Sequence, residues 1–199
     1  FRISFFGGGT DYPEWFNKFG GRVVSSTIDK FCYVSVRDLP PFFNHKYRLV
    51  YSNSEEIKSI NQIRHPSIRE TLKFLKNKTP LEIQHIGDLP ARSGIGSSSS
   101  FTVGLLNSLN HLKNVKINKK KLAQDSIYIE QKLIKENVGS QDQIAAAYGG
   151  FNVINFKKKN NFEVKKIKVP FKNTNNFNKK LILIFTGLQR YSSLIEKEK

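Results

Sequence analysis

The sequence predicts an α+β fold with mixed strands and about four helices. Short segments alternate polar and apolar residues, as half-buried strands do, and longer runs repeat apolar residues at helical spacing. Glycine-rich stretches separate these segments. The 199 residues suit one domain, or one domain with part of another. With 38% hydrophobic and 12% aromatic residues the chain can bury a core, which excludes a disordered composition.

The N-terminal third reads as strands followed by a helix. Residues Arg2 to Phe6 alternate as a strand, which ends at three consecutive glycines. The segment from Val23 to Arg37 predicts a second strand, with Tyr47 to Ser52 as its partner. From Pro66, a residue favoured at the first helical position, a helix is expected. The residues expected on one face of the second strand are Ile28, Cys32, Val34 and Val36, and those on the helix face are Ile68, Leu72 and Leu75.

The glycine loop after the first strand presents an acid. Gly7, Gly8 and Gly9 permit close backbone approach, and Thr10 and Asp11 follow directly. Binding groups are common at such strand ends. A solvated turn aspartate is the alternative interpretation of Asp11.

The stretch from Pro90 to Ser100, PARSGIGSSSS, is the predicted centre of the chain's organisation. It connects a predicted strand, Leu81 to Gly87, to an amphipathic run from Phe101 to Leu112. The junction offers backbone N–H groups, a helix dipole and hydroxyls, which favour an anion such as phosphate. A purely local serine-rich helix cap is the alternative. The loop is not a Walker A motif, because no Lys follows its second glycine.

Two helices with acidic residues are expected next. The first runs from Lys119 to Asn137, and Glu130 lies beside its apolar stripe, where it could equally be an ion-paired surface acid. The second lies within the segment GSQDQIAAAYGG, residues 139–150. Ser140 and Gln143 have the spacing of a capping box there. Asp142 falls in the first turn, where simple helix capping is the alternative to a site role.

The C-terminal part predicts a hairpin and a domain boundary. Strands are expected at Phe151 to Phe156 and Phe162 to Val169, around a Lys-rich tip. We expect residues 1–172 to form one domain, 173–180 a linker, and 181–199 the start of a second domain. The chain lacks methionine and ends on a strand and a helix without packing partners, so we expect it to be part of a longer protein.

Composition limits the other functions. The net charge of +17 raises a nucleic-acid hypothesis, but the excess is mostly lysine spread along the chain, without Arg–aromatic clusters. One cysteine excludes an internal disulfide framework, and the four histidines have no zinc-site spacing, so any metal would have oxygen ligands. No segment has the length of a transmembrane helix and no signal peptide is visible, which favours the cytoplasm.

Three motifs resemble one family. PARSGIGSSSS is similar to the PxxxGLGSSAA phosphate loop of the galactokinase, homoserine kinase, mevalonate kinase and phosphomevalonate kinase (GHMP) family. RISFFGGGTD has the spacing of the galactokinase-type RxNxxGEHTD segment, and Asp142 stands where GxxD carries the family's acid. RISFFGGGTDYPEWF, GSQDQIAAAYGG and FTGLQRYS look closest to the branch that includes heptose 7-phosphate kinases. Ile95 and Ser99–Ser100 replace the family's Leu and Ala–Ala, and the third glycine-rich motif is absent.

The resemblance implies a fold and a set of roles. It implies a two-layer domain like ribosomal protein S5 domain 2, followed by the first elements of a ferredoxin-like domain. Asp142 and Arg2 would be catalytic, and Ser98, or else Ser97, with Glu130 would hold Mg²⁺. Residues implied to bind ATP are Pro90, Arg92, Ser93, Gly94, Ile95, Gly96, Ser97, Ser98 and Ser99. Those implied to bind the sugar are Gly8, Gly9, Thr10, Asp11 and Gln141.

The function implied is an ATP-dependent kinase that phosphorylates the anomeric hydroxyl of a sugar, D-glycero-D-manno-heptose 7-phosphate being favoured. Its partners would be ATP and a sugar or sugar phosphate, without a membrane or nucleic acid. Arg190 is one candidate for a substrate phosphate. A fucose- or galactose-type kinase is the alternative within this class, and a basic S5-like nucleic-acid-binding module is the alternative outside it. The oligomeric state stays open.

Overall fold

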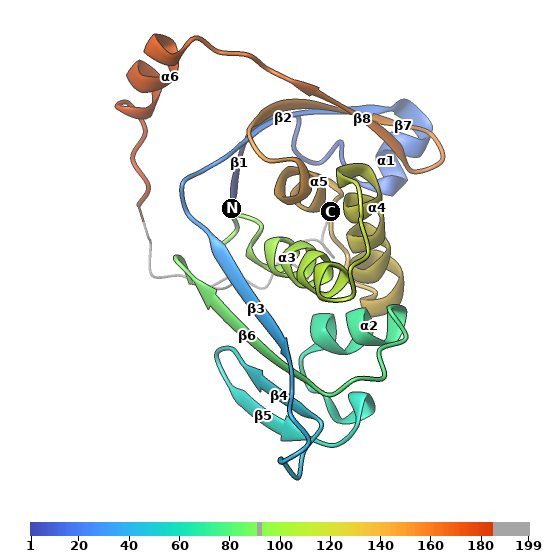
Figure 1. Ribbon diagram of the computed structural model, residues 1–199. Coiled ribbons are helices and arrows are strands. Elements are labelled where there is room, and N and C mark those ends of the chain that lie inside the picture. The colour runs from blue at the N-terminus through green and yellow to red at the C-terminus, as the bar shows by residue number, and fades with distance from the viewer. Residues whose placement is uncertain (91–92, 185–199) are drawn as a thin grey trace.

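The computed structural model describes residues 1–90 and 93–184 (Figure 1). The strands are β1 (Arg2–Phe6), β2 (Gly21–Thr27), β3 (Cys32–Asp38), β4 (Tyr47–Val50), β5 (Ser54–Ile57), β6 (Leu81–Gly87), β7 (Phe151–Lys157) and β8 (Asn161–Lys166). The α-helices are α1 (Pro13–Phe19), α2 (Pro66–Phe74), α3 (Ser97–Leu112), α4 (Lys119–Tyr128), α5 (Gln141–Tyr148) and α6 (Phe171–Asn178). A 3₁₀ turn (Ile60–Gln62) precedes α2, and a π-helical segment (Ile129–Ile134) continues α4.

The strands form two four-stranded sheets. The first sheet has the order β1-β2-β7-β8 and is antiparallel throughout. The second sheet has the order β3-β6-β4-β5, in which β4 and β6 are parallel and the other pairs are antiparallel. Helices α3, α4 and α5 lie between the two sheets (Figure 1). The α+β class expected from the sequence is therefore confirmed.

Hydrophobic clusters join each sheet to the helices. Leu49 and Ile83 of the second sheet pack with Leu105 of α3 and with residues of α2. Val23 and Ile154 of the first sheet pack with residues of α1, α4 and α5. A third cluster joins α3, α4 and the π-helical segment to each other. The helices are thus held on both sides, which fixes the position of their N-termini.

Several predicted elements are confirmed. Strands β1 and β6 have the predicted bounds, Pro66 begins α2, and the hairpin of β7 and β8 forms around its Lys-rich tip. Helix α3 begins earlier than its apolar run, because the serines form its first turn. The predicted helix from Lys119 to Asn137 is α4 followed by the π-helical segment.

Two predictions in the N-terminal third were wrong. The single strand expected from Val23 to Arg37 is two strands, β2 and β3, in different sheets. The chain leaves the first sheet after Thr27, where the Ile28 N–H donates to Phe1 O, and β3 begins at Cys32. The pairing of that strand with the one from Tyr47 was also wrong, because β6 lies between β3 and β4.

Some elements were not expected at all. Helix α1, strand β5 and helix α6 had no counterpart in the sequence analysis. Helix α6 occupies most of the segment expected as a linker, and its described side chains are exposed. The domain boundary placed there stays a prediction.

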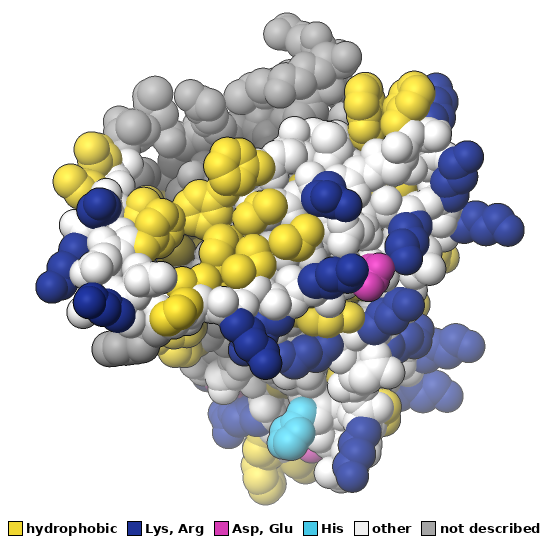
Figure 2. Space-filling view, turned by 90° about the horizontal axis from the view of Figure 1, so that it is seen from above, with side chains coloured by type: hydrophobic (Ala, Val, Ile, Leu, Met, Phe, Trp, Pro, Cys, Tyr) yellow, Lys and Arg dark blue, Asp and Glu magenta, His cyan; other side chains and the backbone are white. Residues whose placement is uncertain are grey.

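The outer face of the first sheet carries aromatic side chains. The Phe5 ring lies 5.8 Å from the ring of Phe151 and 5.7 Å from that of Phe177 in α6. In the view from above, hydrophobic side chains gather on one face, while Lys and Arg are spread around them rather than aligned in one stripe (Figure 2). Within residues 1–90 and 93–184, no helix combines the length and apolar character needed to cross a membrane.

Candidate functional site

The loop between β6 and α3 places a helix N-terminus at the centre of the candidate site. Gly94 and Gly96 have φ angles of 76° and 77°, which strain other residues, and Gly96 is the N-cap of α3. The helix begins at Ser97 without a side-chain cap hydrogen bond. Glycine, not serine, thus occupies the N-cap position itself, and the serines form the first turn. A glycine cap has no side-chain acceptor for the N–H groups of the first turn, which is the arrangement that anion-binding helix N-termini use.

The other predicted loop residues surround this N-terminus. Ile95 accepts a hydrogen bond from the Arg2 N–H, which fixes the loop to β1. The Ser93 Oγ atom is buried without a hydrogen-bond partner among the described residues. Pro90 and Ser98 are exposed, whereas Arg92 lies outside the described residues, as does the FTGLQRYS motif with Arg190.

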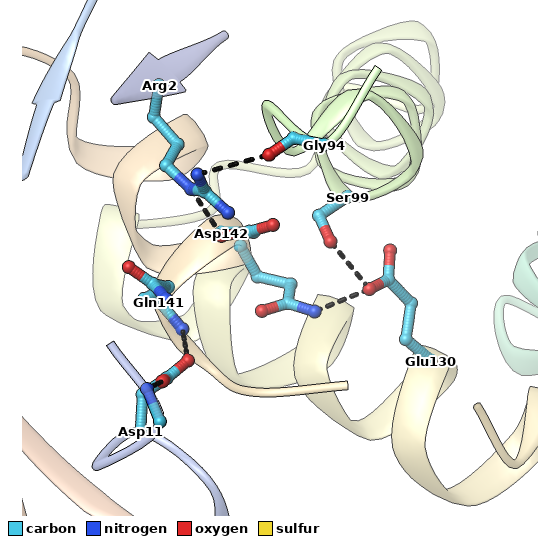
Figure 3. Close-up of polar contacts among 9 residues, drawn as sticks. Arg2, Asp11, Gly94, Ser99, Glu130, Gln141 and Asp142 are labelled. Carbon is cyan, nitrogen blue, oxygen red and sulfur yellow. Dashed lines mark hydrogen bonds and ion pairs between the residues drawn. The ribbon is translucent and has the colours of Figure 1, made fainter. Parts of the chain in front are cut away.

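An ion pair stands beside the loop. The Arg2 Nε atom lies 2.6 Å from Oδ1 of Asp142, in the first turn of α5, and both side chains are largely buried. Arg2 Nη1 also donates to the Gly94 carbonyl over 3.5 Å. The Asp142 carboxylate packs directly against Gly96, because a Cβ atom there would lie 3.1 Å from Oδ2. Figure 3 shows Arg2 between Asp142 and the loop. Arg2 and Asp142, expected to lie together, thus meet at the helix N-terminus.

Asp11 holds the glycine loop against the start of α5. Its side chain is 1% exposed. Oδ1 accepts the Gly9 N–H over 3.1 Å, and Oδ2 accepts the Gln141 N–H over 3.2 Å. Burial raises the pKa of Asp11, the N–H donors of Gln141 and Gly9 oppose this rise, and nearby Asp142 adds to it. The solvated turn aspartate considered above is therefore excluded.

The glycine loop itself is tightly folded. The Thr10 hydroxyl donates to Gly7 O over 2.7 Å, and a Cβ atom on Gly7 would lie 1.8 Å from Arg22 O. Gly8 and Gly9 are exposed beside Asp11. This loop is thus rigid at Gly7 and accessible at the two following glycines.

Glu130 lies in the π-helical segment and is fully buried, not at the margin of an apolar stripe as the sequence analysis expected. The π-helical turn changes the register of side chains, which a regular helical projection does not represent. Its Oε2 atom accepts the Ser99 hydroxyl over 2.8 Å and also the Gln143 amide. Its Oε1 atom has no hydrogen-bond partner among the described residues.

Burial raises the pKa of Glu130 to about 7, opposed by the polar side chains of Thr102, Ser99 and Gln143. The serine that contacts Glu130 is Ser99, although the resemblance implied Ser98 as its partner in a metal site. In α3 the Ser99 side chain faces the interior, while Ser98 faces solvent.

The capping box expected between Ser140 and Gln143 was wrong. Ser140 is the N-cap of α5 but makes no side-chain cap hydrogen bond, because its hydroxyl accepts from the Gln131 amide over 3.1 Å. The Gln143 side chain turns inward to Glu130 instead. Sequence reasoning missed Gln143 and Ser99 as partners of Glu130. The only indication in the sequence was that Ser99 and Gln143 are polar residues at positions on the buried faces of their helices.

Oxygen atoms supply the candidate cation site. In the described part of the chain, no three His, Cys, Asp or Glu side chains come together as a protein-only metal site would require. A buried carboxylate with one unpartnered oxygen among the described residues, beside the Ser99 hydroxyl, is of the oxygen-ligand type that Mg²⁺ takes from proteins. This buried carboxylate lies near a helix N-terminus, a type of position that favours anions such as phosphate.

Part of the chain matches a known protein family. Residues 66–150 match the family described as GHMP kinases N terminal domain, a range that includes the loop, Glu130 and Asp142. This part of the chain is therefore similar to the N-terminal domain of GHMP kinases.

Particular relatives are similar over more of the chain. It is 23% identical to D-glycero-alpha-D-manno-heptose 7-phosphate kinase of Campylobacter jejuni over 100% of its length and 61% of that protein. The fold is similar to that of a D-glycero-D-manno-heptose 1-phosphate kinase from Bacteroides thetaiotaomicron, with a TM-score of 0.75 and 22% identity over 85% of this chain and 58% of that one. For Lactococcus lactis galactokinase complexed with galactose, the TM-score is 0.63 and the identity 21%, over 85% and 46% of the two chains. The chain thus spans about three fifths of the length of the curated relative.

Proposed function

We propose that this domain is the catalytic part of an ATP-dependent sugar kinase. One observation carries the proposal: the Arg2–Asp142 ion pair lies against Gly96, at the uncapped N-terminus of α3. Phosphoryl transfer needs a phosphate cradle, a group that orients the attacking hydroxyl, and positive charge beside both. In this geometry the helix N-terminus, the Asp142 carboxylate and the Arg2 guanidinium are candidates for these three roles, and they contact one another.

The reaction would transfer the γ-phosphoryl group of ATP to a sugar hydroxyl. A bond forms between the hydroxyl oxygen and the γ-phosphorus, the bond from that phosphorus to the β,γ-bridging oxygen breaks, and ADP leaves with its electron pair. Asp142 orients the hydroxyl and accepts its proton, directly or by way of water. Arg2 holds Asp142 in place and offsets negative charge near Gly94.

The loop and the buried acid would hold ATP and its cation. The amides from Gly94 to Ser98 cradle phosphate oxygens, with Pro90, Arg92, Ser93 and Ser99 shaping the loop. Glu130 and a serine hydroxyl hold Mg²⁺, for which Ser98 is the proposal from the resemblance and Ser99 the one favoured by contact. Mg²⁺ supplies charge neutralisation on the transferred phosphates.

The sugar would lie between the glycine loop and α5. Gly8, Gly9 and Thr10 line one side, and Gln141 and Asp142 begin the other. Asp11 accepts two N–H groups from these two sides, so it sets their spacing and still offers lone pairs to a sugar hydroxyl.

The substrate proposed is D-glycero-D-manno-heptose 7-phosphate, phosphorylated at the anomeric hydroxyl. It follows from the motifs shared with that branch and from the relative in Campylobacter jejuni. Fucose- or galactose-type substrates are the alternative within the class. We also propose the cytoplasm as location, and residues 1–172 as the catalytic N-terminal domain ahead of a linker and a second domain.

Product analysis with the complete gene product tests this proposal. ADP release with Mg-ATP is measured against free sugars and sugar phosphates, and the position of the new phosphate is read by ³¹P NMR. Turnover confined to heptose 7-phosphate, with a phosphate at C1, is the expected result. Turnover on an unphosphorylated sugar would support the kinase activity but show that the proposed substrate is wrong. A folded protein with no turnover on any sugar tested would refute the proposal.

A further inference from the structure

A buried polar cluster connects the two halves of the candidate site. Ser99 of α3, Glu130 of the π-helical segment and Gln143 of α5 are 4%, 0% and 0% exposed. None of their side chains can be solvated by bulk water in this structure, so their mutual hydrogen bonds decide their orientation.

Within this cluster the two oxygens of Glu130 are not equivalent. Oε2 accepts from the Ser99 hydroxyl and the Gln143 amide, whereas Oε1 has no hydrogen-bond partner among the described residues. A buried carboxylate oxygen left in this state costs free energy unless a ligand completes it. Donors concentrated on one oxygen therefore leave the other available for a cation.

Gln143 stands directly after Asp142 in the first turn of α5. Successive helical residues point about 100° apart, so Asp142 faces the loop and Arg2 while Gln143 faces the interior. The first turn of α5 therefore positions the Asp142 carboxylate on one side and, through the Gln143 amide, contacts the Glu130 carboxylate on the other.

We propose that Gln143 is a positioning residue for the cation that accompanies ATP. Its amide fixes Oε2 of Glu130 and so presents Oε1 to that cation, while its place in α5 keeps the cation in register with Asp142. This inference rests on the proposed function, and it gives a role to a residue that the resemblance left without one. The Gln143 side chain itself contacts neither substrate.

Direct cation binding tests the proposal without turnover. Mn²⁺ binding in the presence of ADP is measured by electron paramagnetic resonance on the complete gene product and on the Gln143→Met variant, which keeps the buried length but lacks the donor. Loss of an outer partner of a metal ligand weakens metal affinity by about 10–100-fold, so we expect at least a tenfold rise in the Mn²⁺ dissociation constant. Higher Mg²⁺ should partly restore turnover, while the KM for the sugar stays unchanged.

Gln131→Met is the matched control. Gln131 follows Glu130 in the π-helical segment and donates to Val138 O and Ser140 Oγ, so its loss should cost stability without moving Mn²⁺ affinity. If Gln143→Met does not fold, Gln143→Asn withdraws the donor and keeps an amide in the interior.

The outcomes separate the two claims. Unchanged Mn²⁺ affinity in a folded Gln143 variant, with normal binding by the parent protein, would overturn the positioning role and leave the kinase proposal intact. A parent protein that binds no Mn²⁺ with ADP would overturn both. An equal loss of affinity in Gln131→Met would also overturn the positioning role, because general destabilisation would then explain the effect.

Discussion

Gly139→Ala should destabilise the protein by displacing Asp11. A Cβ atom at Gly139 would lie 1.9 Å from Oδ2 and 2.6 Å from Cγ of Asp11. The carboxylate is 1% exposed and cannot swing into solvent without leaving the N–H groups of Gln141 and Gly9.

The size of the effect follows from these contacts. Overpacking costs about 1–3 kcal/mol. A lost hydrogen bond to a charged acceptor costs about 1.5–3 kcal/mol. Two factors reduce this loss: the exposed Gly9 N–H can bind water instead, and the raised pKa of Asp11 shows that its buried charge is already unfavourable. We expect a net loss of about 3 kcal/mol, or roughly 6–12 °C in Tm for a chain of this size.

A double-mutant cycle measured by urea and thermal unfolding isolates the clash. Asp11→Ala alone should cost about 2 kcal/mol, because the Gln141 N–H loses its acceptor. In the double variant the added methyl group meets no carboxylate. The stability loss of the double variant should therefore be about 2 kcal/mol smaller than the sum of the losses in the two single variants. Gly8→Ala is the control, since its Cβ would meet only Ser4 Oγ at 3.9 Å. Strictly additive losses, or a Gly139→Ala variant as stable as the parent, would refute this account of Asp11.

Two further predictions concern the loop and acid stability. Gly94→Ala and Gly96→Ala should each lower stability by about 1–2 kcal/mol, because both residues have a positive φ. Only the Cβ atom of Gly96→Ala would contact Asp142, so the turnover of this variant should be about tenfold lower than that of Gly94→Ala. Equal turnover in the two variants would contradict the contact between Gly96 and Asp142. Burial lowers the pKa of His65 to about 4. An unfolded histidine takes a proton near pH 6.5, so stability is full above that pH and falls by up to about 3 kcal/mol as pH drops toward 4. His65→Phe should flatten this slope in acid unfolding and exposed His111→Phe should not; a slope unchanged by His65→Phe would contradict the burial argument.

The sequence predicted the elements whose pattern is local. Strand β6, the buried face of α3 and the start of α2 each follow from alternation, helical spacing or a proline at the first helical position. The split between β2 and β3 is not local, because the break is stabilised by Phe1 and Gly150, which are distant in sequence.

The candidate site was predictable to a similar degree. Asp11 and Asp142 were proposed because each lies beside a glycine-rich stretch, whereas Arg2 was proposed only through the family resemblance, and the roles of all three stay predictions. The surroundings of Glu130 were not identified, because a π-helical turn shifts side chains from the faces that a 3.6-residue period assigns. Ser99 and Gln143, the partners of Glu130, come from two other helices, which a local pattern cannot reveal.

The most direct test of the account is the Asp142→Asn variant of the complete gene product. Turnover and ATP affinity are measured separately, the latter by calorimetry with a non-hydrolysable ATP analogue. The account predicts at least a hundredfold loss of turnover with nucleotide affinity within about twofold of the parent, because Asp142 acts on the hydroxyl and not on the phosphate cradle. Undiminished turnover would remove Asp142 from the chemistry and contradict the proposed site.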